Sequence, residues 1–221
     1  HNLAFQGGND KGTYYLSLTY LDNNGYVVGD ADTYKRLTAT INADYNIKKW
    51  LQVGPNNQIE YYKRKAVAEG SEYGSLLSSV IMLDPLTPVK YSPDNLPEHM
   101  QTMVNAGKTY LKDKDGNYYS TSAFQETDNY NPYIMRDKSN STNSGYNING
   151  VIYANLKPVK GLVITSRLGY RLSAAKSYTV NNDFYVNTTI NQSYMSVNAS
   201  AATPIYLQWE NFVNYMHSFG K

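Results

Sequence analysis

The sequence contains no cysteine, no long apolar run and few charged residues. The absence of cysteine among 221 residues excludes a disulfide framework and any thiol or thiolate–metal site. No run of about 18 apolar residues occurs, and this excludes a transmembrane helix. Charged residues make up 17% of the chain and the net charge is only +2, without a basic block. The composition therefore does not indicate nucleic-acid binding.

Histidine is also scarce, and the three histidines are far apart in the sequence: His1, His99 and His217. No pair has the spacing of zinc ligands, and no Ser/His/Asp set is indicated. Residues 113–117 (DKDGN) are similar to the start of a calcium loop. Their glycine is at position four instead of six, however, and Phe124 replaces the final glutamate, so we predict a plain turn. We expect no catalytic residue, no metal ligand and no cofactor, and we expect that the protein is not an enzyme.

Tyrosine, in contrast, is abundant, with 23 residues against 5 Phe and 2 Trp. The phenol side chain suits the boundary between lipid and water, so this composition is typical of membrane barrels. A tyrosine-rich soluble β-domain, such as a sugar-binding module, would have a similar composition. The composition alone leaves both classes open.

Apolar and polar side chains alternate along three predicted strands within residues 1–51. Each strand is about ten residues long, and the apolar positions end in tyrosine, as in strands that cross an outer membrane at a tilt. The same pattern returns over 146–156 and 162–172. The side chains expected to face lipid are Leu16, Leu18, Leu37, Ile41, Ile164 and Leu168. An arginine at the membrane midplane would cost several kcal/mol, so three arginines are expected to face the lumen. These are Arg36, Arg167 and Arg171.

The lengths of the connections predict the orientation of the strands. The turns around Gly8 and Trp50 are short, whereas the loop around Asn24 is longer, which is typical of periplasmic turns and extracellular loops. Pro55 in the fourth strand indicates a bulge or a local break. The predicted fold is therefore all-β: part of a large antiparallel transmembrane β-barrel with a long extracellular loop that contains a short helix.

The long loop occupies residues 64–144, where the alternation stops. Residues 75–83 predict the short helix, with Ser75 as its cap and Asp84-Pro85 at its end. We expect this helix either to pack against its own loop or to bind a partner. Three further expectations concern the rest of the loop: a small hairpin around 113–116, extended chain after Pro93, and irregular chain over 128–144.

The chain divides into three predicted parts. Residues 1–63 hold about four barrel strands with short periplasmic turns, 64–144 form the long extracellular loop, and 145–221 hold further strands and an extracellular loop from 173 to 202. The last strand is expected to run from about Ile205 through Tyr215, and residues 215–221 at the end of the chain also have the pattern of a strand. Since the chain opens and stops within apparent strands, we expect a fragment of a larger barrel.

Several segments resemble the SusC/RagA-like TonB-dependent outer-membrane transporters. They are residues 1–18 (HNLAFQGGNDKGTYYLSL), 21–25 (LDNNG), 35–39 (KRLTA), 47–51 (IKKWL), 82–89 (MLDPLTPV) and 218–221 (SFGK). The resemblance implies a location in the outer membrane of a Gram-negative bacterium. It also implies the import of large nutrients, either glycans or oligopeptides.

The same resemblance implies several partners. A SusD-like surface lipoprotein would close over the barrel, and the TonB complex would supply energy through a plug. The plug and the TonB box are absent from this sequence. Loop 64–144 would contact the lipoprotein or the substrate. The alternative is a secreted, soluble β-sandwich that binds carbohydrate, and it predicts that the apolar faces pack against each other in a closed core.

Overall fold

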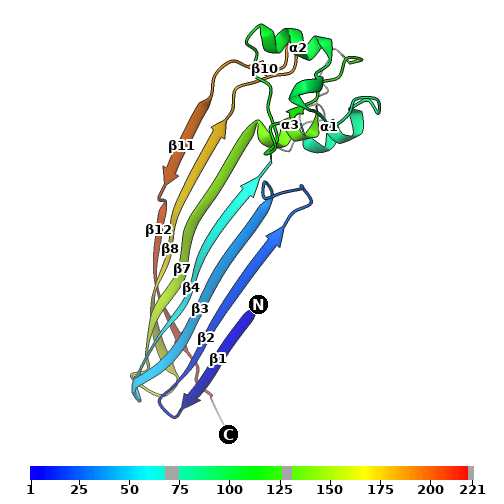
Figure 1. Ribbon diagram of the computed structural model, residues 1–221. Coiled ribbons are helices and arrows are strands. Elements are labelled where there is room, and N and C mark those ends of the chain that lie inside the picture. Colours follow the sequence, from blue (N-terminus) through cyan, green and yellow to red (C-terminus); the bar gives the residue numbers. More distant parts are fainter. Residues whose placement is uncertain (68–74, 126–130, 219–221) are drawn as a thin grey trace.

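The computed structural model describes residues 1–67, 75–125 and 131–218. About half of the chain forms one antiparallel sheet (Figure 1). Its strands are β1 (Asn2–Asn9), β2 (Gly12–Asn24), β3 (Thr33–Lys48), β4 (Leu51–Ala66), β7 (Ser139–Leu156), β8 (Leu162–Asn181), β11 (Ser196–Ala202) and β12 (Ile205–Tyr215). Their order is β1-β2-β3-β4-β7-β8, and both β11 and β12 pair with β8. From β1 to β8, each strand of this sheet thus lies beside the sheet strands that precede and follow it in the sequence. No second sheet covers either face within the described ranges, so the closed core that the sandwich alternative requires is not found there.

The central strands are longer than the predicted ten residues. β3 and β4 have 16 residues each, β7 has 18 and β8 has 20. β4 continues to Ala66 and β7 begins at Ser139, so both extend into the range predicted as loop. β8 likewise passes residue 173 and ends at Asn181. In these outer ends the ladder hydrogen bonds continue, but polar residues such as Lys63, Ser144 and Lys176 interrupt the face that is apolar further along the sheet, so the alternation that marks a strand in the sequence is weakened.

Pro55 interrupts only one of the two ladders of β4. The ladder with β7 is continuous and pairs Pro55 with Ile152. The pairs with β3 stop at Asn42–Asn56 and resume at Tyr45–Val53, followed by a register shift. The predicted local break is therefore present on the β3 side, because proline has no N–H to donate there.

The outer end of the sheet carries a folded cap, which we define as residues 25–32, 75–125, 131–138 and 182–195 (Figure 1). It contains α1 (Leu76–Met82), β5 (Lys90–Tyr91), η1 (Pro93–Asn95), α2 (Glu98–Asn105), β6 (Tyr118–Tyr119), α3 (Pro132–Asp137), β9 (Phe184–Tyr185) and β10 (Asn191–Gln192). Its core joins two different loops, since Tyr119, Ile134 and Met135 pack with Phe184 and Val186. Among the described residues, none of the helices has the length and apolar character needed to cross a membrane.

Two predictions about the cap are confirmed. Ser75 caps α1 in a capping box, with its Oγ accepting from the N–H of Ser78 at 3.1 Å. The hairpin around 113–116 closes through the N–H of Tyr119, which donates to the carbonyl of Leu111 at 3.0 Å.

Three other predictions are wrong. The chain after Pro93 is helical in η1 and α2, because Pro93 and Pro97 stand at helix starts, where a missing N–H costs nothing. The irregular chain predicted over 128–144 contains α3 and the start of β7, and 128–130 lie outside the described residues. The strand expected over 215–221 is not present at 216–218, and 219–221 lie outside the described residues, although the strand predicted from Ile205 through Tyr215 is confirmed as β12.

Candidate functional site: a two-faced sheet with an outer cap

The six leucines and isoleucines predicted to face lipid lie on one face of the sheet. Residues that pair directly across neighbouring strands share a face. Leu16 pairs with Ile41, Leu37 with Tyr61, and Tyr61 in turn with Tyr146. The same register continues across β7 and β8 to Leu168 and Ile164. We call this surface the apolar face. Leu37 and Leu168 on it are 48% and 42% exposed, so nothing in the described chain covers them.

Tyrosines mark the edge of the apolar face that is nearer to the cap. Tyr61 and Tyr146 contact each other with ring centroids 4.9 Å apart. From Tyr146 to Leu156, near the opposite edge, β7 advances ten residues. That is about 33 Å along the strand, or about 25 Å across a membrane at a tilt near 40°. Polar groups within the face are paired locally: the Tyr170 hydroxyl donates to Asn57 Oδ1 at 2.8 Å.

The three predicted lumen-facing arginines lie on the opposite face, which we call the polar face. Arg36 forms an ion pair with Glu60 at 3.7 Å. Glu60 also accepts from Asn147 Nδ2 at 3.0 Å, and the Ser173 hydroxyl donates to Asn147 Oδ1 at 2.6 Å. These contacts form one polar chain across β3, β4, β7 and β8.

The other two arginines do not join that chain. Arg167 pairs with Glu210 on β12. Arg171 lies beside a hollow of about 400 Å³ and makes no ion pair within the described part of the chain. The side chains that share this hollow on the polar face are mostly amides and hydroxyls: Thr40, Asn42, Asn56, Gln58, Asn149 and Tyr206. The structure thus places the three arginines on one face but in separate environments.

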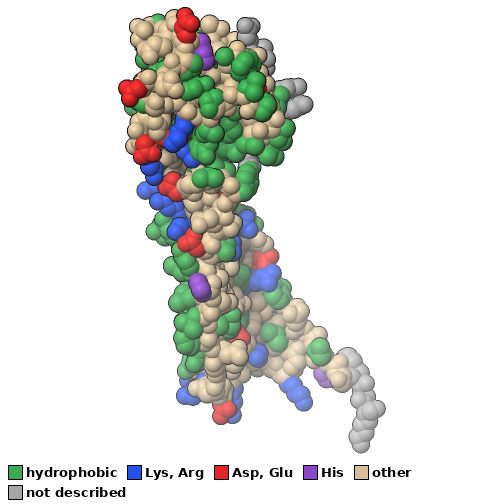
Figure 2. All heavy atoms as spheres, turned by 45° about the vertical axis from the view of Figure 1, so that its right-hand side comes forward, with side chains coloured by type: hydrophobic (Ala, Val, Ile, Leu, Met, Phe, Trp, Pro, Cys, Tyr) green, Lys and Arg blue, Asp and Glu red, His purple; other side chains and the backbone are tan. Residues whose placement is uncertain are grey.

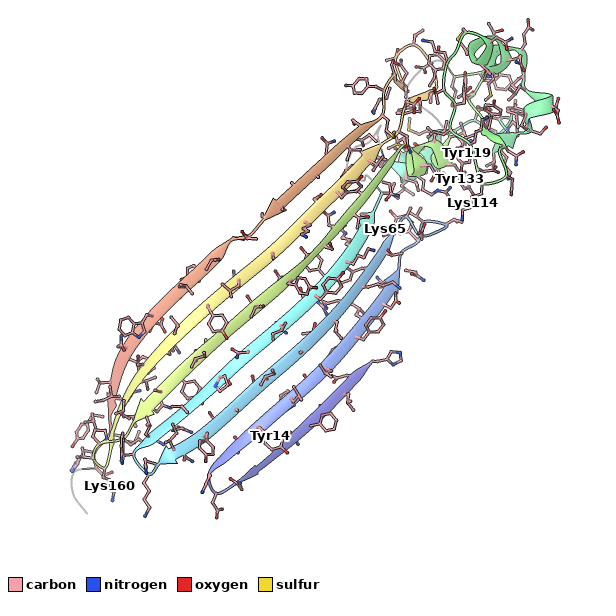
Figure 3. All side chains as sticks on the ribbon, turned by 60° about the vertical axis from the view of Figure 1, so that its left-hand side comes forward. Tyr14, Lys65, Lys114, Tyr119, Tyr133 and Lys160 are labelled. Atoms are coloured by element: carbon pink, nitrogen blue, oxygen red, sulfur yellow. The ribbon has the colours of Figure 1, made fainter. Side chains whose placement is uncertain are left out.

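A cavity of about 420 Å³ lies between the cap and the outer ends of β4 and β7. Lys65 Nζ lies 2.8 Å from Asp30, and this contact holds the pKa of the Asp30 carboxyl below its usual range. Asp137 pairs with Arg136 at 2.6 Å and accepts from the Tyr119 hydroxyl at 2.7 Å. Burial and this carboxylate both raise the pKa of Tyr119. Figure 3 shows Lys65 at the outer end of its strand, below the cap that carries Tyr119.

Sequence reasoning did not identify this cavity. Asp30 and Lys65 are 35 residues apart, and Tyr119 and Asp137 are 18 apart. No local spacing in the sequence indicates either pair. They meet only because the loop between β2 and β3 and the long loop between β4 and β7 fold against the same strand ends.

The helix α1 packs against its own loop on one side and is exposed on the other. Leu76 packs against the cap core and Ser79 is buried. Leu77, Val80 and Ile81 are exposed on its outer side, the last by 74%. Figure 2 shows apolar side chains gathered over this part of the cap. The cap therefore presents an apolar surface in addition to its own core.

The described residues contain no group of three or more His, Asp or Glu side chains placed to hold a metal ion. The chain's organisation is instead that of an all-β sheet with two chemically distinct faces and folded loops at one end.

Comparison with known proteins finds a TonB-dependent receptor that is similar to this chain in sequence. No family model matches the sequence. The chain is 24% identical over 220 residues to the TonB-dependent receptor P39 of Formosa agariphila. The aligned region covers 99% of this chain and 18% of that protein.

The fold is similar to solved structures of the same class. Chains of the RagAB peptide importer in its closed-closed state and of the RagAB peptide transporter match with TM-scores of 0.68 and 0.67, at 17% and 16% identity. Each match covers 100% of this chain and 22% of the other, so this chain spans about a fifth of the length of these relatives. The predicted resemblance to SusC/RagA-like TonB-dependent transporters is confirmed. These relatives are named as a receptor and as importers, not as enzymes.

Proposed function

We propose that this chain forms part of the barrel wall and outer loops of a TonB-dependent transporter that imports large nutrients across the outer membrane of a Gram-negative bacterium. The observation that carries the proposal is the separation of apolar and polar side chains onto opposite faces of a single sheet. A soluble domain would have to cover such an apolar face. In a membrane, lipid covers it.

The apolar face is the lipid side in this proposal, and the polar face is the lumen side. The estimated height of the apolar band, about 25 Å, agrees with that of outer-membrane barrels. Ser17, Thr38 and Thr165 are the buried side chains with polar groups in the sheet, and all three belong to the polar face. Side chains crowd together on the inside of a curved sheet, so this burial supports the same orientation. Arg36, Arg167 and Arg171 then face the lumen.

The cap is the proposed contact region for a SusD-like lipoprotein. Leu77, Val80 and Ile81 of α1 supply an exposed apolar surface at the extracellular end, as a protein interface requires. The TonB complex would act through a plug carried elsewhere in the transporter.

The proposed cargo is an oligopeptide or a glycan. Similarity to RagAB, which is named a peptide importer, favours an oligopeptide. The exposed rings of Tyr26 and Tyr194 in the cap favour stacking against sugar rings. Deleting the transporter gene and comparing growth on oligopeptides with growth on oligosaccharides separates the two: loss on one class alone identifies the cargo.

Cysteine scanning tests the orientation directly, and these 221 residues contain no cysteine of their own. We would introduce Leu168→Cys and Arg171→Cys separately into the full-length transporter, attach a fluorescent maleimide, and reconstitute it with brominated lipid. Quenching is expected for residue 168 and not for residue 171, because the lipid contacts only the apolar face. Position 171 should instead react with a water-soluble maleimide in the folded protein. Quenching at 171, or protection of 168 from both lipid and water, would contradict the proposal; the second result is what a sandwich core predicts.

A further inference from the structure

A row of lysines crosses the apolar face just beyond its tyrosine edge. The pairing register joins Asp22, Lys35, Lys63, Ser144 and Lys176 in one line across β2, β3, β4, β7 and β8. This row is two residues further toward the cap than the row that contains Tyr61 and Tyr146. Because the side-chain period of a strand is two, both rows lie on the same face, about 7 Å apart.

Most of the positive charge in this row has no partner in the chain. Lys35 is paired with Asp22 at 3.0 Å. Lys63 and Lys176 are exposed, and neither forms an ion pair with any described residue. Lys63 also lies directly opposite Lys35, and like charges in that arrangement repel each other. The chain thus maintains a surplus of cations at one level of the sheet.

The geometry between the two unpaired lysines suits a small anion. Ser144 lies between them on β7 and has a short side chain with a hydroxyl donor. Neighbouring strands are about 4.8 Å apart, so the backbones at Lys63 and Lys176 are about 10 Å apart. Two flexible lysine side chains can converge on one oxyanion across that distance, with the serine hydroxyl beneath it. β4 and β8 each pair with a strand on both sides. No additional strand of the barrel can therefore pair with them at the level of the lysine row.

We propose that Lys63, Lys176 and Ser144 bind the phosphate of a lipid headgroup in the outer leaflet of the membrane. The inference rests on the proposed function, which makes the apolar face the lipid side. Tyrosines mark the edge of the hydrocarbon, so the next row outward lies at the level of the headgroups. Phosphate is the anion found at that level, and ammonium groups next to a membrane surface attract it. A protein partner is disfavoured because lipid surrounds this face of the barrel.

The test uses the full-length transporter purified in detergent, with diphosphoryl lipid A and dephosphorylated lipid A as probes. We expect Lys63→Gln to weaken binding of the phosphorylated probe about fivefold, and the double variant with Lys176→Gln about 25-fold. Binding of the dephosphorylated probe should be weak and unchanged. The matched control is Lys157→Gln with Lys160→Gln, which removes the same charge from the turn at the opposite end of the sheet (Figure 3). Heat-modifiable gel mobility verifies that each variant is folded.

Three results would overturn the proposal. The first is that the double variant binds lipid A like the parent protein. The second is that the control variant loses as much affinity as the double variant. The third is that inorganic phosphate at equal concentration competes fully with lipid A, which would indicate a site for free phosphate. Failure of the orientation itself is recognised separately, because residue 168 would then not be quenched by brominated lipid. Quenching at 168 together with unchanged lipid A binding would overturn this inference alone.

Discussion

The side chain of Asn131 connects three segments of the cap, and removing it should loosen the cap without affecting the sheet. Its Nδ2 donates to the carbonyl of Val89 at 2.6 Å and to Ser120 Oγ at 3.0 Å. Its Oδ1 accepts from the N–H of Tyr133 at 3.0 Å and so caps α3. The residue is 1% exposed, so water cannot replace these contacts.

The expected cost of Asn131→Ala follows from these contacts. Loss of a helix cap costs about 1 kcal/mol, and each of the two other hydrogen bonds contributes about 1 kcal/mol. The free energy of opening the cap should therefore fall by about 3 kcal/mol. In native-state hydrogen exchange this corresponds to about 150-fold faster exchange of the amides in α3 and β6, if they exchange through local opening.

Mass spectrometry of peptides from the exchanged full-length transporter gives this measurement. Ser75→Ala provides a matched comparison, because it also removes a helix cap but at a half-buried site with fewer partners. We expect about fivefold faster exchange there, confined to α1. Peptides from β3 and β4 should exchange as in the parent in both variants. If Asn131→Ala accelerates exchange no more than Ser75→Ala, the buried contacts of Asn131 do not stabilise the cap and the reasoning is refuted.

Two further predictions concern the cap at high pH and the packing of the sheet. Burial raises the pKa of Tyr110 to about 12, against about 10 in the unfolded chain. The contribution of the neutral Tyr110 side chain to stability is therefore complete below pH 10 and is lost as the pH rises toward 12. Hydrogen exchange of the cap should therefore report a loss of about 2 to 3 kcal/mol over that range, and Tyr110→Phe should abolish this part; an identical alkaline loss in the variant would contradict the assignment. In the sheet, a Cβ added at Gly54 would lie 2.2 Å from the carbonyl oxygen of Ala43, whereas one added at Gly169 would meet nothing closer than 3.7 Å. Gly54→Ala should lower barrel stability in a denaturant titration by about 1 to 3 kcal/mol and Gly169→Ala by much less, and equal effects would show that the close approach is not a constraint.

The sequence by itself determined the two faces of the sheet. Strand side chains alternate with period two, so the positions of Leu37 and Ile41 relative to Arg36 follow from their order in the chain. The short turns and the capped helix at Ser75 were also predictable, because turn and cap preferences depend on a few adjacent residues. The helix α2 was not predicted, because the local sequence does not distinguish the two roles of proline. Pro93 and Pro97 are compatible both with a helix start and with a helix break.

Only the tertiary structure decided which distant residues meet. β8 reaches Asn181 because ladder hydrogen bonds continue where hydrophobic alternation stops, and composition does not record those bonds. The cap core joins Tyr119 to Phe184, and the lysine row places Ser144 between Lys63 and Lys176. Such neighbours are fixed by strand register and by packing between loops, which depend on the whole chain at once. The chemistry of the cap and of the lysine row therefore became visible only in the folded molecule.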